Sequence, residues 1–207
     1  MKTINHEAFV NLYNKRPIVF KEVFDKSQTL KQLMSKIGDA SMIFQELGYP
    51  DSEKVKGDLF EIFAELFFKV LAADNRIGVF DYKTAPSDED YGVDGFGIGM
   101  DEKPLTVQVK FRSNQEHELT SDELKQFAFQ SFIRYDVDKT TQTNLIIFTS
   151  AKGLHWVTDS KVFSGRLRCI GFDQIRKLVD NNTIFWKECQ LMIGDTINCR
   201  YTTSTFR

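Results

Sequence analysis

Apolar residues recur at helical spacing through the first fifty residues, a pattern that predicts a series of short helices. The apolar stripes are Ala8, Phe9, Leu12 and Tyr13; Leu30, Leu33 and Ile37; and Met42, Ile43 and Leu47. A helix breaker follows each stripe: Pro17, then Gly38, then Gly48 with Pro50. We therefore expect residues 1–50 to form an N-terminal helical extension, packed on a core of residues 51–207.

The strongest helical segment runs from Asp58 to Ala72 and is apolar almost all round, as a buried helix is. Glu61, Glu65 and Lys69 interrupt it at a spacing of four, which places them on one face. A strand is predicted next, at residues 77–82, followed by a polar loop.

Two further segments, residues 91–97 and 107–111, alternate as half-buried strands do. Residues 101–104, Asp-Glu-Lys-Pro, supply a turn between them. The pattern predicts an antiparallel hairpin that brings Asp94, Gln108 and Lys110 to one end of a sheet. Gln108 and Lys110 are two apart, so they share a face.

The second half of the chain continues the alternation of helices and strands. Thr120 and Glu123 have the spacing of a capping box at the start of a helix that extends to Arg134. Residues 144–149 form a compact apolar run typical of a buried central strand. A strand at 167–172 and a helix at 173–180 follow, whereas residues 183–207 give no clear pattern. The predicted fold class is α/β, a mixed sheet flanked by helices.

A carboxylate, an amide oxygen and an amine at one sheet end suit metal-assisted hydrolysis of phosphodiesters. A divalent cation neutralises charge that develops on the phosphate and lowers the pKa of a bound water. Magnesium prefers oxygen ligands and keeps several waters. We expect Asp94 as the first ligand, with the Gln108 amide oxygen, the Val109 carbonyl and Glu61 completing the site. Lys110 would activate the attacking water or hold the phosphate.

These residues resemble the PD-(D/E)XK nuclease superfamily, which has the restriction-endonuclease-like fold, and most closely its Mrr-type branch. The resemblance covers about Gly57 to Val179. Its carriers are a Gly-x-x-Phe-Glu helix opening (Gly57, Phe60, Glu61), an Asp-x-Gly-x-Asp strand entry (Asp90, Gly92, Asp94) and a Gln-x-Lys strand (Gln108, Lys110). In that branch glutamine commonly replaces the second acidic residue. The resemblance implies Asp94 as principal metal ligand, with Glu61 as a helper and Gln108 and Lys110 completing the site.

Each residue also has a simpler interpretation. Asp94 can be a strand-end turn residue, Gln108 a solvent-facing position and Lys110 a solvated edge charge. Glu61 can close a capping box with Asp58, and Glu65 can be a surface partner of Lys69. These alternatives stay open at the level of the sequence.

Phosphate contacts are expected from Arg112, which is nearest the proposed site, and from Lys152 and Arg168. His155 and Trp156 follow the central strand, where they can stack on DNA or pack in an interface. The net charge of −2 gives no indication of an overall positive field that would attract nucleic acid. A local basic groove is compatible with this nearly neutral total.

Cysteine usage and hydropathy indicate the compartment. Three cysteines, Cys169, Cys189 and Cys199, lack Cys-x-x-Cys spacing, which argues against a zinc site or a disulfide scaffold. No apolar run approaches a membrane span and no apolar signal region begins the chain. We expect a cytoplasmic protein in a reducing interior, with no membrane partner.

The sequence thus predicts a magnesium-dependent DNA endonuclease, of restriction or homing type, in which manganese substitutes for magnesium. Double-strand cleavage would favour a homodimer or higher homo-oligomer, and the branch's helicase fusions imply a functional link to a helicase. Two alternatives remain: a nucleic-acid-binding or assembly module that does not cut, and a junction resolvase acting on branched DNA.

Overall fold

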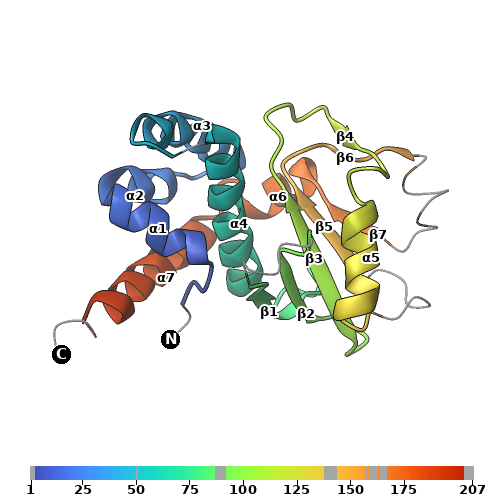
Figure 1. Cartoon of the computed structure of the whole chain (residues 1–207). Helices are drawn as coiled ribbons and strands as arrows, with labels where there is room; N and C mark the ends of the chain where they lie inside the picture. Colours follow the sequence, from blue (N-terminus) through green and yellow to red (C-terminus); the bar gives the residue numbers. More distant parts are fainter. Residues whose placement is uncertain are drawn as a thin grey trace. The chain divides into compact units, whose positions relative to one another are not determined.

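The chain divides into a helical unit and a unit built on a mixed β-sheet (Figure 1). The computed structural model describes residues 3–49, 51–86, 92–137, 144–156, 158, 163 and 167–202. The helical unit comprises Met1–Leu71 with Leu178–Arg207, and the sheet unit comprises Ala72–Lys177. This division differs from the boundary expected at residue 50, because the long helix after residue 51 groups with the N-terminal helices. Within the described ranges, every helix is too short or too polar to cross a lipid bilayer.

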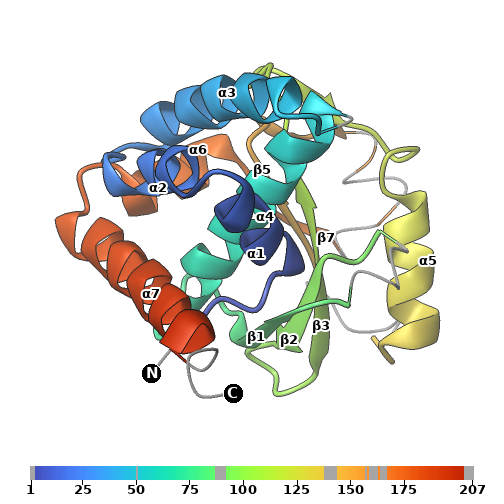
Figure 2. The ribbon, with the colours of Figure 1, turned by 60° about the vertical axis from the view of Figure 1, so that its left-hand side comes forward.

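The helical unit is assembled around its longest apolar helix. Its helices are α1 (Glu7–Lys15), α2 (Pro17–Asp25), α3 (Leu30–Glu46), α4 (Ser52–Val70) and α7 (Thr183–Thr202). Helix α4 lies against α1, α3 and α7 (Figure 2). It contributes Phe60, Phe63 and Phe67 to the core, and all three are fully buried. An almost wholly apolar helix is stable at the centre of a bundle because each of its faces meets a neighbour.

Helix α3 differs from the sequence prediction, which expects a break at Gly38. Helix α3 runs through Gly38 without a break, and its buried positions continue with Ala40 and Phe44. The predicted stripe of Met42, Ile43 and Leu47 is therefore wrong, since these side chains are exposed. A single glycine costs a helix about 1 kcal/mol, which burial of the flanking apolar residues offsets.

The C-terminal helix α7 had no clear signal in the sequence. Its buried residues are Phe185, Trp186, Cys189, Met192, Ile193 and Thr196. That spacing is helical, but exposed Ile184 directly precedes these positions and exposed Leu191 lies among them, which reduces the contrast between the faces. The helical spacing of α7 is therefore present in the sequence, but two exposed apolar residues obscure it.

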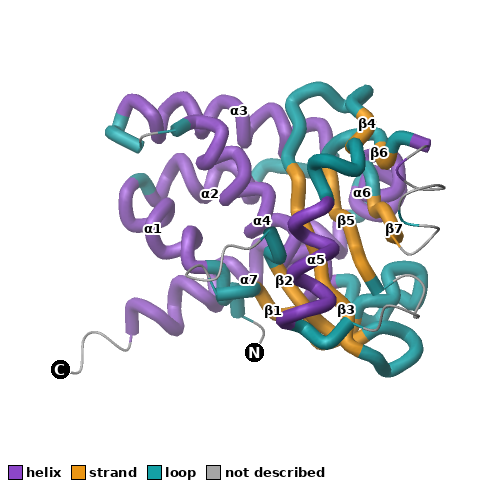
Figure 3. The backbone as a smooth tube through the Cα atoms, turned by 45° about the vertical axis from the view of Figure 1, so that its right-hand side comes forward, coloured by secondary structure: helices purple, strands orange, loops and turns teal. Residues whose placement is uncertain are grey.

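The sheet unit contains a mixed sheet in the order β1-β2-β3-β5-β7 (Figure 3). The strands are β1 (Phe80–Thr84), β2 (Gly95–Ile98), β3 (Pro104–Lys110), β5 (Leu145–Thr149) and β7 (Leu167–Ile170). Strands β1, β2 and β3 pair antiparallel, and β3, β5 and β7 pair parallel. The predicted mixed α/β class and the predicted hairpin are confirmed.

Helix α5 (Lys125–Arg134) covers one face of this sheet (Figure 1). Phe127 and Ala128 of α5 pack with Leu145 and Ile147 of β5, and Thr106 on β3 donates a hydrogen bond to Ser131 at 2.7 Å. Gln108 pairs in register with Ile147, so Gln108 and Lys110 also belong to this face. The remaining elements are helix α6 (Phe172–Val179) and a short parallel ladder of β4 (Glu118–Leu119) and β6 (Gly153–Leu154).

Gly97 in β2 leaves no room for a side chain. A Cβ atom at this position would lie 2.6 Å from the Phe80 carbonyl oxygen of the neighbouring strand. We expect Gly97→Ala to lower the free energy of unfolding by about 2 kcal/mol, because backbone must shift to relieve the overlap. Denaturant unfolding measures this loss, with Gly38→Ala, where a Cβ meets nothing within 4 Å, as the control. Equal stability of Gly97→Ala and wild type would contradict the packing described for β1 and β2.

Candidate active site

Asp94 lies directly before β2 and extends its pairing with β3. Its backbone N–H donates to the Val107 carbonyl at 2.9 Å. Its carboxylate Oδ2 accepts a hydrogen bond from the Val109 N–H at 2.6 Å. The Asp94 carboxylate therefore accepts the β3 hydrogen bond just before β2 begins. This bond fixes the carboxylate beside the last residues of β3.

The burial of Gln108 is the feature of this region that differs most from the sequence-based alternatives. It is only 3% exposed, so the solvent-facing interpretation is wrong. Its Oε1 is buried and has no hydrogen-bond partner in the described part of the chain. The amide lies close to Gly92, where a Cβ would be 3.2 Å from Nε2. A buried acceptor left unpaired costs about 1–3 kcal/mol, so this oxygen is in place for a partner that the described residues do not supply.

The Val109 carbonyl faces the same side of β3 as Asp94. Thr106 N–H donates to the Asn144 carbonyl, and Ser150 N–H donates to the Lys110 carbonyl, so the even-numbered residues of β3 pair toward β5. Backbone groups of successive strand residues point to opposite sides. The Val109 carbonyl therefore points to the side on which Val109 N–H binds Asp94.

Lys110 is the last residue of β3 and lies opposite Thr149 of β5. Strand β3 is the central strand of the sheet, so the interpretation of Lys110 as an edge charge is wrong. Its side chain is partly exposed and follows Gln108 on the same face. An amine at this position can reach a phosphate that approaches the end of the sheet.

This donor set fits a magnesium ion that keeps most of its waters. The described residues contain no cluster of three His, Cys, Asp or Glu side chains that could hold a metal. Asp94 supplies one carboxylate, and the Gln108 Oε1 and the Val109 carbonyl are neutral oxygens. One or two carboxylates with waters and substrate phosphate suffice for magnesium. The observation that favours a cation here is the Gln108 oxygen, which is buried with no partner among the described residues.

Glu61 belongs to the helical unit, whereas Asp94, Gln108 and Lys110 belong to the sheet unit. Its Oε2 lies 2.7 Å from His6 Nε2. Burial lowers the pKa of His6, but the hydrogen bond and the charge of Glu61 outweigh this and raise it. The metal role of Glu61 stays a prediction.

The capping interpretation of Glu61 is wrong. Helix α4 begins six residues before Asp58, and its N-cap is Asp51, whose side chain accepts from Glu53 N–H at 2.8 Å. Asp58 lies inside the helix, paired with Lys54. Glu65 pairs with Lys69 as predicted, but it is fully buried rather than on the surface.

Arg112 follows β3 and is held by an acidic partner. Its Nη2 donates to Glu123 Oε1 at 2.6 Å, and its Nη1 donates to the Phe111 carbonyl. Glu123 also accepts from the Thr120 N–H at 2.8 Å, which is the reach-back contact of the predicted capping box, although α5 itself begins at Lys125. Partial burial raises the pKa of Glu123, but the bonds from Arg112 and Thr120 outweigh it and lower the pKa to about 2.

This depressed pKa makes Glu123 a source of acid sensitivity. Ionised Glu123 stabilises the folded state above its ordinary pKa of 4.5, and the stabilisation is lost as pH falls from 4.5 toward 2. We expect Tm of the wild type to fall more steeply over this range than Tm of Glu123→Gln. Thermal unfolding at stepped pH measures the two slopes, with the exposed Glu116→Gln as a control that keeps the wild-type slope. Parallel curves for wild type and Glu123→Gln would contradict the Arg112–Glu123 contact.

The other predicted phosphate contacts are not brought together at this site. Lys152 is exposed, with Nζ 3.7 Å from Glu118 Oε1. Arg168 lies on β7 next to Cys169, and Cys169 shares the face of Gln108, so Arg168 lies on the opposite face. Its guanidinium donates to the Ile77 carbonyl, and burial lowers its pKa. Trp156 is 61% exposed.

Asp90, which opens the Asp-x-Gly-x-Asp pattern, lies outside the described residues.

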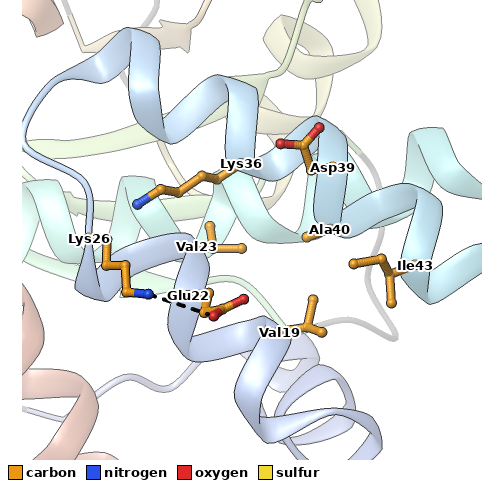
Figure 4. A pocket seen from close by; sticks show the side chains of 8 residues that line it. All are labelled: Val19, Glu22, Val23, Lys26, Lys36, Asp39, Ala40 and Ile43. Carbon is orange, nitrogen blue, oxygen red and sulfur yellow. Dashed lines mark ion pairs between the residues drawn. The ribbon is translucent and has the colours of Figure 1, made fainter.

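A separate cavity of about 250 Å³ lies between α2 and α3 of the helical unit (Figure 4). Val19, Val23, Ala40 and Ile43 form its apolar walls, and Glu22, Lys26, Lys36 and Asp39 contribute charges. Lys26 pairs with Glu22, whereas Lys36 Nζ is buried with no hydrogen-bond partner among the described residues. Burial lowers the pKa of Lys36. The cavity lies wholly within the helical unit and contains none of the predicted site residues.

Comparison of the sequence with models of known protein families gives no match, and comparison with curated proteins gives no similar sequence.

Proposed function

We propose that the chain is a magnesium-dependent DNA endonuclease whose site lies at the carboxyl end of β3. The observation that carries this proposal is the buried Gln108 Oε1, which has no hydrogen-bond partner in the part of the chain that the structure describes. Gln108 lies two residues before Lys110 on β3, the strand to which the Asp94 carboxylate is hydrogen-bonded. An acceptor of this kind is retained at a cost in stability, and a bound cation would remove that cost.

Each of the proposed site residues has a distinct chemical role. Asp94, Gln108 Oε1 and the Val109 carbonyl would hold the ion, which supplies a water of lowered pKa and neutralises charge on the phosphate. Lys110 would hold the scissile phosphate by charge or orient the attacking water. Glu61 is proposed as a helper on the basis of the resemblance. Manganese is expected to substitute, because it accepts the same oxygen ligands.

We infer a restriction-endonuclease-like fold of the Mrr-type branch for the sheet unit. A mixed sheet with an antiparallel β1-β2-β3 meander and parallel β5 and β7 supports it, as does a Gln-x-Lys motif on the central strand. Arg112 is the phosphate contact that this arrangement favours, although it must leave Glu123 to bind. Lys152 would contribute from the surface.

A second candidate is a nucleic-acid-binding or assembly module that keeps this fold and does not cut. The donor set contains one carboxylate in the sheet unit, and the described residues contain no three-residue cluster of strong metal ligands. A domain of this fold that no longer cleaves DNA would not need a larger set of metal ligands.

The deciding experiment incubates the purified chain with a mixture of linear, nicked, branched and single-stranded DNA, with magnesium and with a chelator. The proposal predicts cleavage that requires magnesium. Preference for branched over linear DNA would identify a junction resolvase, whose chemistry is the same. Metal-independent binding of DNA without cleavage of any substrate would overturn the nuclease and support the second candidate.

A further inference from the structure

We propose that Thr149 and Ser150 are positioning residues, whose buried hydroxyls hold the segment Lys110–Arg112 so that the Lys110 amine is placed at the site. This inference rests on the proposed nuclease function. Thr149 is the last residue of the buried strand β5 and Ser150 follows it, and neither side chain is exposed to solvent.

The Lys110 carbonyl receives two donors from β5. Ser150 N–H donates to it at 3.2 Å, and Thr149 Oγ1 donates to it at 2.8 Å. The Thr149 hydroxyl also accepts from the Ala151 N–H at 3.1 Å. Since that contact occupies an acceptor position of Oγ1, the hydroxyl proton is directed toward Lys110.

The Ser150 hydroxyl continues this connection past the end of the ladder. Its Oγ accepts from the Arg112 N–H at 2.6 Å and donates to the Arg112 carbonyl at 3.0 Å. One hydroxyl therefore satisfies both backbone groups of Arg112. We call the side-chain bonds from Thr149 and Ser150 to Lys110 and Arg112 the hydroxyl clamp.

The position of Lys110 explains why a clamp is needed. Lys110 is the last residue of β3, and the ends of elements are where backbone order is lowest. A lysine side chain has a flexible stem, so its amine can be placed only if its Cα is fixed. Thr149 is also the register partner of Lys110, so the clamp acts at the residue whose placement matters most.

The test compares Thr149→Val with Thr106→Val. Both threonines are fully buried on neighbouring strands of the same sheet, and both hydroxyls donate one hydrogen bond, at 2.8 and 2.7 Å. Only Thr149 contacts the Lys110 backbone; Thr106 contacts Ser131. Thr149→Ser keeps the hydroxyl and provides the rescue variant.

We expect Thr149→Val to lower kcat about tenfold or more with KM changed less than about twofold, because misplacement of a catalytic group by about 1 Å is costly. Thr149→Ser should recover most of kcat. Thr106→Val also loses a buried hydroxyl that donates a hydrogen bond, and it should keep kcat. Equal kcat values for Thr149→Val and Thr106→Val would overturn the positioning role.

A second measurement keeps the clamp testable if Thr149→Val does not fold. Ser150→Ala leaves the Arg112 N–H without its acceptor, so amide exchange of Arg112 should accelerate at least about tenfold relative to Thr106→Val. Unchanged exchange would show that the hydroxyls do not hold this segment. If the wild type cleaves no DNA while Arg112 exchange responds as expected, the nuclease proposal fails, and with it the catalytic meaning of the clamp.

Discussion

Asp94→Asn is expected to lose magnesium-dependent cleavage almost completely while the fold remains intact. Asparagine keeps an oxygen that can accept from the Val109 N–H, so the contact seen at 2.6 Å survives. The substitution removes the negative charge on which cation binding depends. We expect the single-turnover rate to fall about 10³-fold, which corresponds to about 4 kcal/mol of transition-state stabilisation.

Two further variants distinguish the catalytic effect of the Asp94 charge from the structural effect of its hydrogen bond. Asp94→Ala removes the acceptor as well and should cost a further 1–3 kcal/mol or so in unfolding free energy, because Val109 N–H is left unpaired. Asp101→Asn, which changes an exposed carboxylate in the turn of the same hairpin, should cleave as wild type does. Full activity of Asp94→Asn would show that the carboxylate is only a strand-end contact.

Gln108→Met is expected to lower the cleavage activity while it keeps or raises the stability of the fold. Methionine is close to glutamine in shape. The substitution removes a buried acceptor that has no partner within the described residues. Stability should equal or exceed that of the wild type by up to about 1 kcal/mol. Cleavage should fall about 10²-fold, because a ligand oxygen of the ion is lost.

Gln108→Glu is the matched variant for this prediction. It supplies a carboxylate oxygen at the same place, so cleavage should be retained. In the absence of metal a buried carboxylate is unfavourable, so Gln108→Glu should be less stable than the wild type and should regain Tm when magnesium is added. A loss of both stability and activity in Gln108→Met would indicate a packing role for Gln108.

The hairpin of β2 and β3 and the buried strand β5 were predictable because their patterns are local. Residues 95–98 and 104–110 alternate, and the turn between them carries the expected polar residues and proline. The run at residues 145–149 is apolar throughout because parallel β5 lies between β3 and β7. The prediction that Asp94, Gln108 and Lys110 lie at one end of the sheet followed from strand alternation and from the pairing of the hairpin.

The partners of the site residues could not be predicted, because they are distant in sequence. His6 contacts Glu61 across fifty-five positions, and Ser150 contacts Arg112 across thirty-eight. Serine and threonine after a buried strand carry no local signal for such contacts. Likewise, no sequence periodicity indicates that the Gln108 Oε1 is buried with no partner in the described ranges, because this depends on three-dimensional packing.

The most direct test of the central claim is a titration of the wild type and Asp94→Asn with Mn²⁺, followed by the electron paramagnetic resonance signal of the free ion. The account predicts saturable binding of a single ion to the wild type and binding at least about tenfold weaker in Asp94→Asn, since a direct carboxylate ligand should matter at least as much as the outer-shell partners of a metal site. Equal binding by the two proteins, or none by either, would contradict a metal site at Asp94, Gln108 and Val109.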